Sequence, residues 1–155
     1  MEKKKNFFKK KLHSIKTLKQ SILQYEFKYH SKGAKTLTYN QFYDVVSDSL
    51  FYNQTLSPEL KKQLQLLKKK KSIKYVDFET FEDFHSMSQN FAAIKKAVEL
   101  YDSTGVALNK KNFKNAVQKV SGLKVNDRVV DLVFALFDED NNGVLELDEF
   151  KQSLN

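Results

Sequence analysis

Side chains that carry oxygen are concentrated in one short stretch near the end of the chain, residues 138–149. Oxygen-bearing side chains stand at its positions 1, 3, 5, 9 and 12, namely Asp138, Asp140, Asn142, Glu146 and Glu149. A hard divalent cation such as Ca²⁺ takes about six to eight oxygen ligands, from carboxylates, carbonyls and water. The stretch therefore carries the donor set for one such ion.

The other positions of the stretch fit a loop that wraps around that ion. Gly143 stands at position 6, where the chain must turn sharply with a positive φ. Val144 at position 7 offers its backbone carbonyl, and Glu149 at position 12 can supply both carboxylate oxygens. Phe137 and Phe150 bracket the loop with apolar side chains.

We therefore interpret residues 138–149 as an EF-hand calcium loop. The predicted ligands of its single Ca²⁺ are Asp138, Asp140, Asn142, Val144, Glu146 and Glu149. We expect an affinity in the range of calcium sensors, roughly 10⁻⁷–10⁻⁵ M. The alternative interpretation is an acidic surface turn that resembles a site by chance.

A short pattern, an aliphatic residue followed five positions later by Phe, recurs along the chain. Its four copies are Leu37 with Phe42, Ile73 with Phe78, Leu108 with Phe113, and Leu145 with Phe150. They start 36, 35 and 37 residues apart, which indicates a repeated supersecondary unit. In an EF-hand the aliphatic residue lies in a loop strand that pairs with a neighbouring hand, and the Phe begins the exiting helix. We predict an all-α fold of four EF-hand helix-loop-helix repeats, paired first with second and third with fourth.

Apolar periodicity and capping residues predict the helices between the loops. An N-terminal helix carries one apolar face, formed by Phe8, Leu12, Ile15, Leu18, Ile22, Tyr25 and Tyr29. Ser57 and Pro58 indicate a helix start, Asn109 and Asn126 are candidate N-caps, and Gly122 is a candidate helix end. We expect the apolar stripes, including the N-terminal one, to form the core.

Three of the four loops lack the chemistry of an ion site. In the first, positions 1, 3, 5 and 12 would be His30, Lys32, Ala34 and Gln41, and a lysine repels a dication. The second would use Leu66, Lys68, Lys70 and Asp77. The third contains Asp102 but is one residue short and ends in Asn112, which leaves only weak binding near Asp102 open.

These assignments divide the chain into three parts. We expect a basic amphipathic helix over 1–29, a degenerate EF-hand pair over 30–88, and over 89–155 a pair that contains the functional loop.

The charge is strongly basic, with a net value of +8, and Arg128 is the only arginine. Nucleic-acid readers usually rely on arginine, so we expect no nucleic-acid partner. A lysine excess fits weak contact with anionic lipid or protein surfaces, or simply a solvated face. The chain has no cysteine, its three histidines are far apart, and it has no glycine-rich phosphate loop, so we expect no enzyme.

The residues around the last loop resemble those of the mitochondrial calcium uptake (MICU) family, which regulates the calcium uniporter channel. The closest stretch is 127–138, which runs into the loop, and segments 25–30, 78–84 and 97–101 also resemble family segments. The similarity follows the C-terminal half of family members, in order, over nearly the whole chain. No counterpart of the family's upstream functional hand is found, so the chain is either a fragment or a reduced paralogue.

The resemblance implies a location and partners. The protein would lie at the intermembrane-space face of the inner mitochondrial membrane, dimerise, and bind the uniporter channel or a paralogous EF-hand subunit. Its calcium ligands would be those already predicted in 138–149. One alternative is a calmodulin-like cytosolic sensor or buffer, although only two methionines are present to line a target groove. Another is a membrane-surface protein that uses its lysines.

Overall fold

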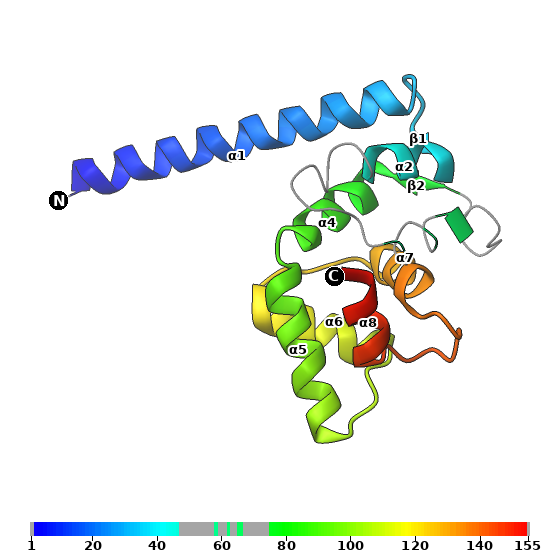
Figure 1. Ribbon diagram of the computed structural model, residues 1–155. Helices are drawn as coiled ribbons and strands as arrows, with labels where there is room; N and C mark the ends of the chain where they lie inside the picture. The colour runs from blue at the N-terminus through cyan, green and yellow to red at the C-terminus, as the bar shows by residue number, and fades with distance from the viewer. Residues whose placement is uncertain (1, 47–57, 59–61, 63–64, 67–74, 155) are drawn as a thin grey trace.

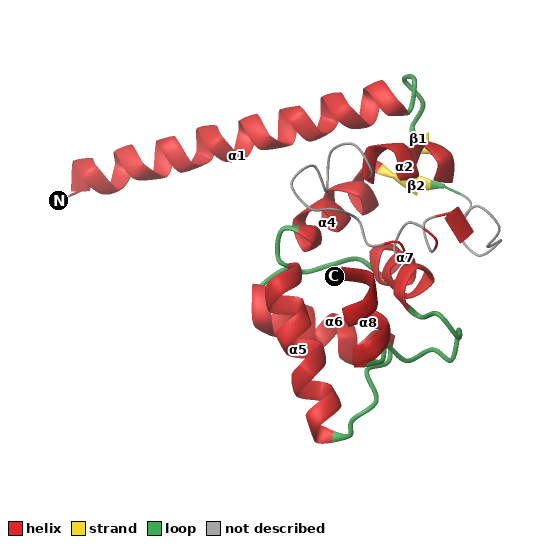
Figure 2. Ribbon diagram, in the orientation of Figure 1, coloured by secondary structure: helices red, strands yellow, loops and turns green. Residues whose placement is uncertain are grey.

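The computed structural model describes residues 2–46, 58, 62, 65–66 and 75–154 (Figure 1). Figure 2 shows that these residues are mostly helical. In chain order the elements are α1 (Glu2–His30), β1 (Thr36–Leu37), α2 (Tyr39–Val45), β2 (Val76–Asp77), α4 (Phe78–Ser88), α5 (Phe91–Thr104), α6 (Lys110–Ser121), α7 (Asp127–Phe137) and α8 (Leu147–Leu154). The helix predicted to begin at Ser57 lies for the most part outside the described residues. Within the described residues, no helix has an apolar segment long enough to cross a bilayer.

The predicted caps of the second half are confirmed. The Asn109 side chain accepts a hydrogen bond from the Asn112 backbone N–H at the start of α6. The Asn126 side chain accepts one from Val129 at the start of α7. Gly122 follows α6 with a φ of +72°, the left-handed conformation that glycine adopts without steric cost. These caps fix the bounds of the two helices that lead to the last loop.

The loops pair as predicted, first with second and third with fourth. β1 and β2 form an antiparallel sheet in which Leu37 lies opposite Val76. In the second half the Leu145 N–H donates to the Leu108 carbonyl over 3.0 Å, next to an isolated antiparallel bridge between Asn109 and Val144. The all-α EF-hand fold with paired loop strands is therefore confirmed.

The predicted position of the second copy of the repeat is wrong by three residues. The residue opposite Leu37 is Val76 rather than Ile73, so the Phe that follows five positions later is Phe81 rather than Phe78. Burial agrees, because Phe81 has no exposed surface whereas Phe78 is half-buried. Asp77 is consequently not a loop ligand but the N-cap of α4, where it accepts a hydrogen bond from Thr80.

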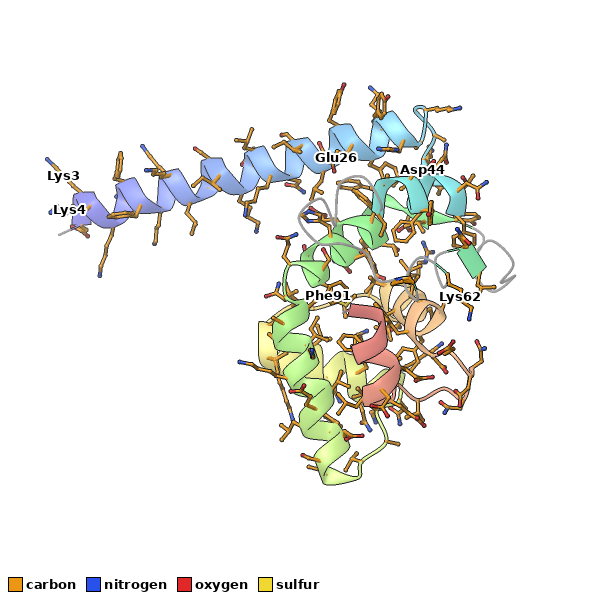
Figure 3. All side chains as sticks on the ribbon, viewed as in Figure 1. Lys3, Lys4, Glu26, Asp44, Lys62 and Phe91 are labelled. Carbon is orange, nitrogen blue, oxygen red and sulfur yellow. The ribbon has the colours of Figure 1, made fainter. Side chains whose placement is uncertain are left out.

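Phenylalanines join the two halves into one core. Phe91, at the first residue of α5, contacts the rings of Phe84 in α4, Phe137 in α7 and Phe150 in α8, with centroid distances of 6.1–6.5 Å. Figure 3 shows Phe91 where α5 meets the end of α4. The residues on both sides of the last loop therefore pack on the same ring.

Polar contacts also hold α7 against the first half. Arg128 forms an ion pair with Asp77, and the Asn126 backbone N–H donates to Asp83 in α4 over 3.0 Å. Burial alone would raise the pKa of Asp77, but hydrogen bonds from Thr80 and the charge of Arg128 lower it below its ordinary value. The first turn of α7 is thus fixed to α4, at the end of the helix opposite the loop.

The apolar face predicted for the N-terminal helix is not core. The helix forms as expected, but Leu23 and Phe27 are the α1 residues that are buried, against α2 and α4. The predicted stripe, from Phe8 to Tyr29, is exposed throughout. Figure 1 shows that α1 runs across the top of the molecule and that its N-terminal half extends beyond the other described helices. In its C-terminal half, Leu23 and Phe27 face α2 and α4 instead of the stripe.

Candidate metal centre

The last loop connects α7 to α8 and begins at a buried carboxylate. Asp138 caps the C-terminal end of α7, where its N–H donates to the Phe134 carbonyl over 3.0 Å. Among the described residues it is the one buried charged side chain, at 5% exposure. Burial of an unpaired carboxylate is costly, so this position indicates that the loop is built around compensating groups.

Three carboxylates converge in this loop. One oxygen from each of Asp138, Asp140 and Glu149 lies within 4.8 Å of the other two. Of the described residues, these form the one group of acidic or histidine side chains close enough to share a metal ion. Neither Asp138 nor Asp140 forms an ion pair with a lysine or arginine of the described part of the chain.

Backbone N–H groups hold the aspartates in place. Asn142 donates its N–H to both Asp138 and Asp140 over 3.0 Å, and Gly143 donates to Asp138 over 3.0 Å. The turn that allows this uses Gly143 at a φ of +81° and Asn141 at a φ of +59°. The sequence motif predicts the glycine of this turn but not Asn141, although Asn is among the residues that tolerate positive φ.

Glu149 links the two ends of the loop. One carboxylate oxygen accepts from the Glu139 N–H over 2.9 Å, and the other accepts from the Glu146 N–H over 3.1 Å. Its position in the first turn of α8 places the negative charge at a helix N-terminus, which the helix dipole favours. Both oxygens therefore face the loop, as a bidentate ligand requires.

The remaining predicted ligands lie around this cluster. The Asn142 side chain donates to Asp140 over 3.0 Å, and its oxygen accepts from the Val144 N–H over 2.8 Å. Glu146 is exposed and does not belong to the three-carboxylate group. Coordination by each of the six residues stays a prediction.

The donor set fits a hard dication. Like charges within 4.8 Å repel one another, and a cation between them offsets that repulsion. The donors are carboxylate, amide and carbonyl oxygens, and the chain contains no thiolate. That chemistry matches calcium rather than zinc or copper.

The polar side chains of the third loop form hydrogen bonds with nearby backbone carbonyls instead of converging on an ion site. The Asn112 side chain donates to the carbonyl of Ala107, while Ser103 and Thr104 hydrogen-bond back to carbonyls of α5. Asp102 is exposed and stands in no carboxylate cluster of the described residues. The first loop likewise ends in a neutral capping box, in which the Gln41 side chain accepts from the Thr38 N–H over 2.8 Å.

Comparisons with known proteins found chains similar in sequence and in fold. No protein-family model matches the chain. Calcium uptake protein 1, mitochondrial, of Homo sapiens is 32% identical over 147 residues, which cover 94% of this chain and 29% of that protein. Calcium uptake protein 3, mitochondrial, of Mus musculus is 27% identical over 86% of this chain and 25% of its own length. The chain thus spans less than a third of these curated relatives.

Solved structures show the same fold at lower identity. A crystal structure of EFHA2 in a Ca-binding state superposes with a TM-score of 0.71, at 22% identity over 92% of this chain and 46% of that one. The apo structure of the mitochondrial calcium uniporter protein MICU2 gives a TM-score of 0.60, at 19% identity over 86% and 40%. The chain is therefore an EF-hand protein related in sequence to the mitochondrial calcium uptake proteins.

Proposed function

We propose that the chain binds one Ca²⁺ ion in the loop 138–149 and acts as a calcium-responsive regulator of mitochondrial calcium uptake through the uniporter. The observation that carries the proposal is the convergence of Asp138, Asp140 and Glu149 within 4.8 Å. The sequence relation to calcium uptake proteins supports the regulatory role.

The residues that would hold the ion are Asp138, Asp140, Asn142, Val144, Glu146 and Glu149. A bound dication would bring positive charge to this group of carboxylates. Asp138 lies at the end of α7 and Glu149 in the first turn of α8, so the angle between these helices depends on how the two carboxylates are held. Phe137 and Phe150, each next to one of these ligands, touch each other and Phe91, so a change at the loop reaches α5.

Partners and location are also proposed. The protein would act at the intermembrane-space face of the inner mitochondrial membrane, with the uniporter channel or a paralogous EF-hand subunit as its protein partner, and would form a dimer. Support comes from relatives that are named as mitochondrial calcium uptake proteins. A regulatory, non-enzymatic role fits the same relatives. We also propose the division into 1–29, 30–88 and 89–155.

A calmodulin-like sensor with cytosolic targets is less well supported. Such sensors grip target helices with a methionine-rich groove that opens on calcium binding. This chain has two methionines, and Met87 is fully buried in the core. Calcium-dependent dye binding to the free protein would nevertheless favour that alternative.

The regulatory proposal can be tested in mitochondria of the source organism from which this chain has been deleted. Wild-type protein, Glu149→Gln or Glu139→Gln is reintroduced, and calcium uptake is followed against external calcium concentration. Both variants lose one charge in the same loop, but Glu139 lies outside the predicted ligand set. We expect Glu149→Gln to shift the calcium dependence and Glu139→Gln to match wild type. Uptake that is unchanged by deletion of the chain would overturn the proposal.

A further inference from the structure

An apolar stripe runs along α1, and no described part of the chain covers it. Each of its members is at least 44% exposed: Phe7, Phe8, Leu12, Ile15, Leu18, Ile22, Tyr25 and Tyr29. At a rise of 1.5 Å per residue, the stripe is about 33 Å long. Soluble proteins seldom leave so many large apolar side chains in water along one face, and such a surface marks an interaction site.

The stripe lies on a different side of α1 from the residues that pack on the protein. With about 100° per residue, its centre is roughly a third of a turn away from Leu23 and Phe27, which face α2 and α4. Figure 1 shows α1 as a straight helix along one edge of the molecule. A flat surface can therefore meet the stripe along its length without displacing any other helix that the structure describes.

Lysines border the stripe on both sides. In helical projection Lys3, Lys10 and Lys28 fall on one edge and Lys5 falls on the other, whereas Lys16 lies on the side that faces α4, where it lines a cavity with His85. In all, α1 contains nine lysines and two glutamates, and none of its lysines forms an ion pair with a described residue. Figure 3 shows Lys3 and Lys4 at the end of α1 that is farthest from the body.

We propose that this face of α1 binds the surface of a membrane that contains anionic phospholipid, with the helix lying in the plane of the interface. Aromatic and aliphatic side chains would enter the boundary between headgroups and acyl chains. The long lysine stems would cover the edges of the stripe while their ammonium groups reach lipid phosphates.

A second copy of the chain fits this face less well. Two such helices side by side would bring their border lysines together, and Lys4, Lys11 and Lys19 project between members of the stripe. Like charges across a helix pair destabilise it. An anionic bilayer can accept the apolar side chains of the stripe and attract the basic borders at the same time.

The membrane surface is independent of the calcium loop and goes beyond the proposed function. Cosedimentation of the 155-residue chain with vesicles, in the presence of EDTA, tests it. We expect binding to vesicles of phosphatidylcholine mixed with phosphatidylserine, and at least about tenfold weaker binding to phosphatidylcholine alone. Raising the salt from about 0.1 M to about 1 M should also weaken binding, because the Debye length falls from about 10 Å to about 3 Å.

Two triple variants separate the apolar and the charged contributions. Phe8→Gln with Leu12→Gln and Leu18→Gln replaces three exposed apolar members of the stripe by polar residues, and Gln is compatible with a helix. Lys3→Gln with Lys10→Gln and Lys28→Gln removes one border. Its matched control makes the same charge change outside α1, at the exposed residues Lys111, Lys119 and Lys124. Circular dichroism checks that every variant remains helical.

The proposal predicts that both α1 variants lose about tenfold or more in vesicle binding while the control retains wild-type binding. It is overturned if the chain does not bind anionic vesicles, or if the control loses as much vesicle binding as the border variant. It is equally overturned if light scattering finds a dimer that the stripe variant converts to monomer, since a second copy would then cover the face.

Discussion

The side-chain amide of Asn112 donates a hydrogen bond of 2.7 Å to the backbone carbonyl of Ala107. Ala107 directly precedes Leu108, as Val144 precedes Leu145, so its carbonyl is the one that a functional hand offers to calcium. In the third loop that carbonyl accepts its hydrogen bond from the protein itself. The third hand therefore keeps its loop structure without an ion and still pairs with the fourth hand through Leu108 and Leu145.

This bond predicts that restoring a carboxylate at position 12 does not restore a site. Asn112→Glu should remove the bond to Ala107 and lower the free energy of unfolding by about 1 kcal/mol. Calorimetry should still give one ion per chain, because Ser103 and Thr104 remain turned toward their own helix. A stoichiometry of two ions would contradict this account.

Loss of the bidentate carboxylate should abolish most calcium affinity. Glu149→Gln keeps the size of the side chain and one acceptor for the Glu139 or Glu146 N–H, but it removes a full charge from the ligand group. We expect the Kd to rise by about 100-fold or more, equivalent to about 2.7 kcal/mol, with little change in thermal unfolding without calcium. The matched variant Glu139→Gln should bind like wild type, and similar losses in both would argue against a specific role for Glu149.

Gly143 should matter for calcium binding because of its backbone conformation, and not because a larger side chain would clash. An added Cβ would meet nothing within 4 Å, so Gly143→Ala costs only the strain of a φ of +81°. That strain is about 1–2 kcal/mol, which should weaken calcium binding by about tenfold. Gly122→Ala, at a φ of +72° in a similarly open position at the end of α6, is the control. It should lower stability comparably while leaving the Kd unchanged.

His85 should make the packing of α1 on α4 sensitive to mild acid. Burial, and then the charge of Lys19, lower the pKa of His85 below 6.5. Below pH 6.5 the unfolded chain takes up this proton more readily than the folded one, so stability falls until the pH passes below the folded pKa. Lys16, Lys19 and Glu82 line the same cavity as His85, so they are the charges that its protonated ring would face.

Thermal unfolding from pH 7.5 to 5 measures this effect. The decline should be smaller in His85→Gln than in wild type. His13→Gln, which changes an exposed histidine of α1, should follow wild type. Identical pH profiles for His85→Gln and wild type would rule out the effect.

Local chemistry in the sequence was enough to predict the helix ends and the loop. Asn109, Gly122 and Asn126 act as expected because capping depends on residues within one turn. The loop 138–149 was predictable for the same reason, since its oxygen donors are close in sequence. The Asn112 contact was not predicted, because an amide can donate or accept and only the folded loop shows which carbonyl it meets.

The frame of the second repeat and the exposure of the apolar face of α1 depend on contacts between distant residues, and the sequence did not predict them. Ile73 and Val76 are both followed five residues later by Phe, so the pattern alone allows two frames for the second repeat. Pairing of Val76 with Leu37, far away in the chain, selects one. Likewise periodicity found the apolar face of α1 but carried no information on whether another element covers it.

The central claim is that the oxygens from Asp138 to Glu149 hold a single calcium ion. Titration calorimetry of the 155-residue chain with Ca²⁺ tests it most directly. We expect a stoichiometry of one ion per chain and a Kd of roughly 10⁻⁷–10⁻⁵ M. An absence of binding heat together with an unchanged melting temperature at millimolar calcium would contradict it.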